Sequence, residues 1–392
     1  MKTLNNYINE WKLTDDSAKN INIDKDCFVC KLDIEDSINL FYTSNYEFLE
    51  NIKYVIVNGK KCGFENGQTI DEFPAGTYEV YVPGFSKFKP DDIKDMFSEN
   101  SQLVKIQFFN TSKVTDMESM FYNCANLETI PWLDTKNVYD MNHMFQDCVN
   151  LKHIPKLDTS NVEDMSGMFD SCTSLETVPL FDTSDVENME GMFQNCFKLR
   201  YVPNFNTQKV TTMEDMFWHC YELINAPKFK YMSKINNMSG MFYECKKLKT
   251  FPQYNFIDVE DTSWMFYNCE SLINVGGLET HYVSNMESMF NGCKSLKKIP
   301  LFDTSCVENM DRMFCDCISL ESVPQLNGEE VTNIDNMFYN CKSLKTVPLF
   351  IDPNNNYILS DMINTFKGCR NLDEQTKKEW KKIYNFRSHC KK

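Results

Sequence analysis

Eleven cysteines recur at an almost constant spacing through most of the chain, and cysteine offers the widest chemistry of any residue type here. Successive intervals are 24 residues, apart from one of 25 and a final one of 28. Such an array could bind metal, form disulfides or pack as small buried thiols. Ten of the eleven follow a Met-Phe pair on an apolar stripe, the last follows Thr365-Phe366, and Asn100 takes the place of cysteine in the first copy, so we expect core packing. The in-phase cysteines are Cys124, Cys148, Cys172, Cys196, Cys220, Cys245, Cys269, Cys293, Cys317, Cys341 and Cys369.

A CxxC pair and a row of acidic turn residues are further candidates for metal chemistry. Cys27 and Cys30 have no second pair at zinc spacing, so we expect neither a zinc nor a redox site there. Calcium binding is one interpretation of the turn residues, but the glycine-rich calcium repeats are absent. We expect their side chains to bond neighbouring backbone amides instead. These turn residues are Asp134, Asp158, Asp182, Asn206 and Asp303.

The sequence shows no arrangement of residues that is typical of a catalytic site. The five histidines are scattered at positions 143, 153, 219, 281 and 389, without a serine or cysteine triad or a glycine-rich phosphate loop. We therefore expect no enzyme, no catalytic residue, no metal site and no cofactor.

The cysteines belong to a repeated unit, VxxMxxMFxxCxxLxx[IV]PxφDTSx, where φ is Leu or Phe. With the degenerate copy around Phe97, the chain holds about twelve units. Apolar residues from Val162 to Cys172 recur at helical spacing, which predicts a short amphipathic helix. Ser160 with Glu163 fits a capping box, and the following LxxVP predicts one short strand. Stacked units predict an α/β solenoid with a parallel sheet on one face and short helices on the other.

This unit resembles the repeats of the BspA-like leucine-rich-repeat proteins, over residues 96–372. The resemblance implies a leucine-rich-repeat solenoid that is used for adhesion or protein binding and not for catalysis.

The sequences on either side of the predicted solenoid, residues 91–372, predict three further segments. Residues 23–90 contain an Asn58-Gly59 hairpin signal and the alternating PAGTYEVYVPG, and they resemble a small all-β sandwich. Residues 1–22 predict a short helix that could anchor the chain to a larger assembly through Leu4, Tyr7, Ile8 and Trp11, and they loosely resemble the start of gut-bacteriophage proteins. Residues 373–392 predict a basic helix that caps the last repeat.

Composition limits the classes of partner. A net charge of -16 argues against nucleic acid as a partner. No apolar stretch approaches the roughly 20 residues of a membrane span, so no span is expected. The start of the chain has no classical signal peptide, so a cytoplasmic or virion-associated location is favoured over Sec-dependent export.

Two sets of residues are candidates for ligand binding. The first set would point outward from the strands on a concave face: Glu128, Lys152, His153, Glu176, Arg200, Tyr201, Lys249, Lys297, Lys298, Glu321 and Lys345. The second set follows the repeated Phe on the convex side: Tyr122, Trp218, Tyr243, Tyr267 and Tyr339. We expect a non-enzymatic leucine-rich-repeat protein that binds a protein or glycan ligand in adhesion or host interaction. The alternative is a structural or accessory bacteriophage virion protein.

Overall fold

The computed structural model describes residues 28–34, 38–41, 52–83, 93–229, 231–254, 258–351 and 362–390, with side chains as far as residue 383 except that of Phe108. The candidate anchor residues Leu4, Tyr7, Ile8 and Trp11, and Cys27 of the CxxC pair, lie outside these residues. The chain divides into two compact units, Met1–Asp185 (unit 1) and Val186–Lys392 (unit 2).

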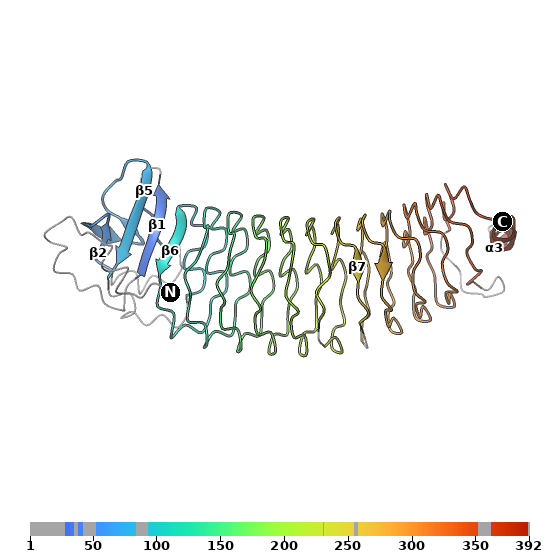
Figure 1. Cartoon of the computed structure of the whole chain (residues 1–392), viewed down its shortest axis with the longest axis horizontal. Helices are drawn as coiled ribbons and strands as arrows, with labels where there is room; N and C mark the ends of the chain where they lie inside the picture. Colours follow the sequence, from blue (N-terminus) through green and yellow to red (C-terminus); the bar gives the residue numbers. More distant parts are fainter. Residues whose placement is uncertain are drawn as a thin grey trace. The chain divides into compact units, whose positions relative to one another are not determined.

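Unit 1 begins with a six-stranded antiparallel sheet in the order β4-β3-β2-β5-β1-β6 (Figure 1). Asn58 and Gly59 join β2 to β3 with positive φ values of 46° and 83°, which confirms the predicted hairpin. The predicted strand in PAGTYEVYVPG is β5. The strands of this sheet are β1 (Phe28–Ile34), β2 (Tyr54–Val57), β3 (Lys60–Glu65), β4 (Gln68–Thr69), β5 (Gly76–Val82) and β6 (Leu103–Phe108).

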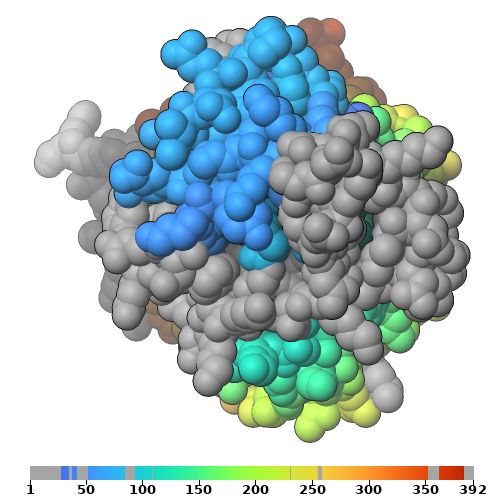
Figure 2. Space-filling view, turned by 90° about the vertical axis from the view of Figure 1, so that its left-hand side faces the viewer, coloured from blue at the N-terminus to red at the C-terminus, as the bar shows by residue number. Residues whose placement is uncertain are grey.

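The first repeat is part of this sheet, because its strand β6 pairs with β1. The Phe97 ring stacks on Phe28 at 5.2 Å, so the repeat core continues into the sheet. Figure 2 shows the described residues before residue 84, in blue, gathered in the upper part of the face that it draws. The sheet therefore crosses the boundary that we expected near residue 90.

Asn100 joins the sheet region to the first repeat at the position that cysteine takes elsewhere. Its buried amide nitrogen donates to the carbonyls of Asn39 and Leu40 at 3.2 and 3.1 Å. Its oxygen accepts hydrogen bonds from the amides of Gln102 and Leu103. Here an amide is required because a thiol could not serve all four groups.

Asn100→Leu is expected to lower the free energy of unfolding of unit 1 by about 2 kcal/mol, because it leaves buried backbone groups without partners. Urea denaturation followed by circular dichroism measures the loss. Asn150→Leu, at an exposed position with ordinary negative φ, controls for the change of residue type; an equal loss in both variants would contradict this role of Asn100.

The repeats are built from consecutive turns, and the prediction of a short helix in each repeat is wrong. Around Phe145 the amides of Met144, Gln146 and Cys148 each bond to the carbonyl three residues earlier. Two residues of each repeat have positive φ: the one before the Met-Phe pair and the one before the cysteine, as at His143 (52°) and Asp147 (60°). A left-handed residue at every fourth position cannot belong to an α-helix.

The remaining amides bond to the next repeat. The amides of His143, Phe145 and Asp147 donate to the carbonyls of Ser166, Met168 and Asp170 at 2.8–2.9 Å. Alternate amides thus serve their own repeat and its neighbour. This explains how a helix-like apolar spacing arises without a helix, since both geometries place every third or fourth residue on the buried side.

Rings and thiols form ladders in the core of each unit. In unit 1 the rings from Phe97 to Phe169 are nearly parallel, with centroids 5.4–5.6 Å apart. In unit 2 the rings from Phe193 to Phe366 repeat this at 5.2–5.8 Å. The Cys148 thiol is fully buried and donates to the carbonyl of Phe121 at 3.1 Å, a contact that recurs down both units. The prediction that these cysteines pack in the core is confirmed.

Parallel pairing between repeats is short. Isolated parallel bridges link residues one repeat apart, such as Thr129 with His153, and one longer pair joins β7 (Thr250–Phe251) to β8 (Asn274–Val275). Within the described residues we therefore find a series of parallel bridges in place of the long parallel sheet that we expected. Buried threonines add to the pairing, as Thr159 donates to the carbonyl of Asp182 at 2.7 Å.

Helix α3 (Glu374–Cys390) follows the last repeat of unit 2, where the sequence predicts a basic helix. Its amino-terminal turn is capped by Asp373, whose carboxylate accepts the Thr376 amide at 2.7 Å. Trp380 is buried and packs edge-on against Phe366 at 5.0 Å. Its indole nitrogen donates to the carbonyl of Val347 at 3.2 Å.

Candidate binding surfaces

The acidic turn residues bond to their own backbone. The carboxylate of Asp158 accepts hydrogen bonds from the amide and the hydroxyl of Ser160. In the same way, Asp182 accepts both from Ser184, and Asp303 accepts both from Ser305. The expectation of local backbone bonding is confirmed at these positions. The capping box of Ser160 with Glu163 is not formed, because no helix begins there.

One group of carboxylates in the described residues is close enough to share a cation. Oxygens of Asp116, Glu118 and Asp140 lie within 4.8 Å of one another. Asp116 and Asp140 each accept a backbone amide two residues on, and Glu118 pairs with Lys94. Burial, followed by the charges of nearby carboxylates, raises the pKa of Asp140. These existing contacts favour a structural role for the group.

The strand positions of unit 1 point to solvent. Glu128, Lys152, His153 and Glu176 are all exposed. The Lys152 amide bonds to the carbonyl of Glu128, so their side chains stand in neighbouring repeats. This part of the surface carries both signs of charge.

The equivalent positions of unit 2 form what we call the basic column. Five members are basic and one is acidic, although the whole chain has a net charge of -16. Tyr201, Ile224 and Ile273 expose 61%, 40% and 52% of their surface between these charges. The basic column comprises Arg200, Tyr201, Ile224, Lys249, Ile273, Lys297, Lys298, Glu321 and Lys345.

Backbone hydrogen bonds order the basic column. The amide of Lys249 bonds to Ile224, and that of Ile273 bonds to Lys249, at 3.1 and 2.9 Å. Lys345 and Glu321 also form an ion pair at 3.0 Å. Side chains that stand in fixed register on a rigid backbone present their charges and apolar groups with little further loss of entropy on binding.

The aromatic residues that follow the repeated Phe contact one another in unit 2. Trp218 stacks on Tyr243 at 3.6 Å, and Tyr243 stacks on Tyr267 at 4.5 Å. Burial, more than the neighbouring Tyr267, raises the pKa of Tyr243 to about 12. Because the faces of these rings already pack against one another, their main role is to stabilise the contact between neighbouring repeats. Tyr339 lies under the Lys367 ammonium at 5.8 Å, and Tyr122 is half-buried in unit 1.

Sequence reasoning missed the neighbours of this stack. Phe197 and Tyr221, which each follow an in-phase cysteine, stack at 5.1 Å, and the Lys246 ammonium lies 4.6 Å from the Tyr221 ring. Ile224 and Ile273 of the basic column were also missed. Their regular position after Leu223 and Leu272 could have identified them as exposed.

Asp215, which lies beside the aromatic stack, should make the stability of unit 2 depend on pH. Burial, and then the charges of Glu214 and Glu190, raises its pKa to about 7. A raised pKa in the fold means that folding favours the protonated acid, so stability falls as the pH rises from about 4 to 7. Asp215→Asn is expected to stabilise unit 2 by about 1–2 kcal/mol at pH 8, allowing for partial exposure, and to have no effect near pH 3.5.

Urea denaturation of both proteins across this range measures that difference. Asp258→Asn, at an exposed position, is the control. A stabilisation by Asp215→Asn that is the same at pH 3.5 and pH 8 would show that the carboxyl does not titrate as described.

In both units the contacts define one class of protein, in which short repeats stack through hydrogen-bonded turns and a shared apolar ladder. A family model described as "Mycoplasma protein of unknown function, DUF285" matches residues 91–199, 149–254, 176–275 and 260–380. These ranges together cover 91–380, well over half of the 392 residues, and the chain belongs to this family.

No curated protein matches the chain. Among solved structures, the chain is similar to a leucine-rich repeat protein from Eubacterium ventriosum, with 17% identity, a TM-score of 0.37, and coverage of 66% of this chain and 81% of that one. It is also similar to a leucine-rich repeat protein from Bacteroides ovatus, with 18% identity, a TM-score of 0.29, and coverage of 69% and 88%. In the described residues no helix has the length and apolar character to cross a membrane.

Proposed function

We propose that this chain is a non-enzymatic binding protein and that its basic column docks an acidic surface of a protein ligand. The observation that carries this proposal is the concentration of five basic residues around exposed Tyr201, Ile224 and Ile273 in a strongly acidic chain. Exposed apolar side chains among charges are typical of protein interaction sites. The aromatic stack is the weaker candidate because its ring faces are covered.

Charge reversal tests this proposal. The full chain is immobilised, and proteins retained from extracts of the producing cells are quantified. We expect the unaltered chain to retain a distinct acidic protein. The triple variant Arg200→Glu/Lys249→Glu/Lys297→Glu should capture at least tenfold less of that protein, because each reversed charge weakens binding.

The matched control is Lys234→Glu/Lys294→Glu/Lys342→Glu, which changes the net charge equally at exposed positions outside the basic column. The ligand, once purified, is then titrated against all three proteins at two salt concentrations. Equal losses in the two triple variants would mean that net charge, and not the basic column, governs capture, and the proposal would fail.

Within this proposal, the repeat motif supports membership of the BspA-like branch and a role in adhesion or host interaction. A glycan ligand is the second possibility for the same surface. The alternative role is that of a bacteriophage virion protein anchored through residues 1–22. Deleting these residues separates the two roles, since loss from purified particles supports the virion role and unchanged particles with lost cell binding support adhesion.

A further inference from the structure

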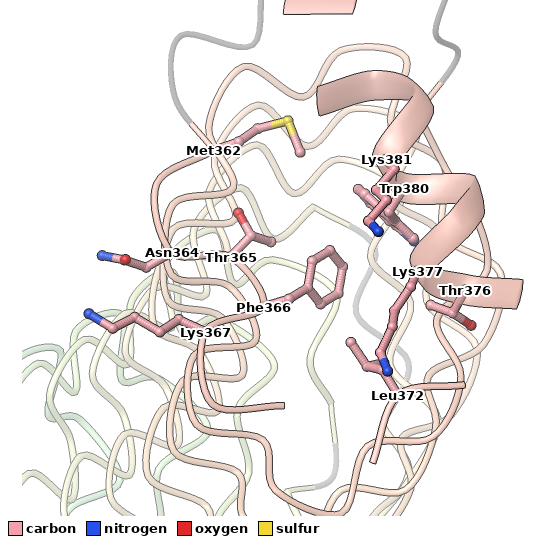
Figure 3. Close-up of a pocket in the computed structure, with 10 residues that line it drawn as sticks. All are labelled: Met362, Asn364, Thr365, Phe366, Lys367, Leu372, Thr376, Lys377, Trp380 and Lys381. Atoms are coloured by element: carbon pink, nitrogen blue, oxygen red, sulfur yellow. The ribbon is translucent and has the colours of Figure 1, made fainter. Parts of the chain in front are cut away.

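The last described repeat of unit 2 leaves one ring of the Phe ladder open. Phe366 stacks on Phe338 at 5.4 Å, and its edge meets Trp380. Whereas Phe338 and the ladder rings before it are fully buried, Phe366 is only partly covered. Its free side faces a cavity of about 280 Å³ between the repeat and α3 (Figure 3).

Two backbone donors at the same place have no acceptor among the described residues. In the preceding repeat the amides of Phe338 and Asn340 donate to the carbonyls of Thr365 and Lys367 at 3.0 and 2.7 Å. The corresponding amides one repeat later belong to Phe366 and Gly368, and no acceptor for them is found in the part of the chain that the structure describes. The edge therefore offers N–H groups at the spacing of a further repeat.

The cavity has an apolar floor and a basic rim. Phe366, Leu372 and Trp380 line the floor, and three lysines but no acidic residue are among the lining residues. Lys377 and Lys381 stand one turn apart on α3, and Figure 3 shows Lys377 extending beside Leu372. Lys377 also pairs with the exposed Glu374 at 2.8 Å, a contact that a stronger anionic partner can replace.

We propose that this cavity and edge bind an acidic peptide segment of a partner protein that carries an aromatic residue, and that the bound segment takes the place of a further repeat. The aromatic ring would stack on Phe366, carbonyl oxygens would accept the free amides, and carboxylates would face Lys377 and Lys381. Each contact copies one that already joins neighbouring repeats, apart from the lysines, which select for acidic sequence. This site is separate from the basic column and does not depend on it.

A peptide with the sequence of residues 158–181 is the probe, with Cys172→Ser to prevent oxidation. It contains the Met168-Phe169 pair, five acidic residues and no lysine or arginine. A fluorescent label reports its binding to the full chain by anisotropy. We expect saturable binding, about tenfold weaker for the Phe169→Ala peptide, because the stacked ring is lost.

On the protein, Lys377→Glu/Lys381→Glu is expected to weaken peptide binding about tenfold, because two attractive charges become repulsive. Lys378→Glu/Lys382→Glu is the matched control, since it makes the same change one residue further along α3 at exposed positions, and it should bind within about twofold of the unaltered chain. Hydrogen exchange at the Phe366 and Gly368 amides should slow when the peptide binds.

Three results would overturn the proposal: no saturable binding at millimolar peptide, equal affinity of the Phe169→Ala peptide, or equal weakening by the two α3 variants. A stronger loss in Lys297→Glu/Lys298→Glu would assign the peptide to the basic column instead. Light scattering that reveals a dimer abolished by Lys377→Glu/Lys381→Glu would assign the edge to a second copy of the chain.

Discussion

Replacing Phe242 with alanine is expected to lower the free energy of unfolding of unit 2 by about 3–5 kcal/mol, the range for a large aromatic residue removed from a packed core. The Phe242 ring lies 5.2 Å from Phe217 and 5.8 Å from Phe266, and its edge meets Phe251 at 5.6 Å. Alanine therefore opens a cavity between two repeats, and the ordered backbone on both sides limits collapse around it.

Urea denaturation followed by tryptophan fluorescence measures this loss, because Trp218 and Trp264 lie in the repeats on either side. Tyr282→Ala removes a ring that is 54% exposed and serves as the control, with a change of less than about 1 kcal/mol expected. In a stack of repeats the loss of stability should fall first on the neighbouring repeats, so hydrogen exchange should increase most near residue 242. A loss as small as that of the control would mean that the ladder is not the main source of stability.

Gly167→Val is expected to destabilise unit 1 by about 3 kcal/mol, through two causes that add. Gly167 has φ of +56°, where a side chain costs about 1–2 kcal/mol and a β-branched one is still less favourable. A Cβ atom there would also come within 2.3 Å of Nδ1 of His143, whose imidazole would have to move. Overpacking of this kind costs about 1–3 kcal/mol.

Ser171→Gly, four residues later, is the complementary change. Ser171 also has positive φ, +58°, so glycine is expected to stabilise unit 1 by up to about 1 kcal/mol. In a helix the same change would cost about 0.5 kcal/mol, so the sign of the effect separates turns from a helix. Denaturation of both variants by urea gives the two values, and a destabilising Ser171→Gly would contradict the turn geometry.

The repeat, its phase and its buried residues could be predicted from the sequence because burial depends on periodicity. Val162, Met165, Phe169 and Cys172 are all buried as expected. The backbone geometry was missed because a chain of turns and a short helix put similar residues inside. One signal was available: four Asn, two Asp and two Gly, eight of eleven residues, precede the in-phase cysteines. These types tolerate left-handed backbone and disfavour helix interiors.

The candidate surfaces were predicted in part. The strand positions from Glu128 to Lys345 are exposed, or partly exposed at Glu321, as expected for residues that lie between two buried apolar residues of each repeat. The cavity beside α3 could not be predicted, since its shape depends on how Trp380 of the helix that follows the last repeat covers only part of that repeat. Only the folded backbone brings residues 362–367 and 377–381 together.

The buried in-phase thiols give each repeat after the first its own chemical reporter of opening. Burial raises the pKa of Cys124, Cys220 and Cys269 well above that of an ordinary thiol, so they resist alkylation while their repeats are closed. Among the cysteines whose side chains the structure describes, Cys306 is exposed and should be modified first. The rate of iodoacetamide labelling of each buried thiol relative to that of Cys306, measured by peptide mass spectrometry, would therefore give the free energy of local opening for one repeat after another along a single chain.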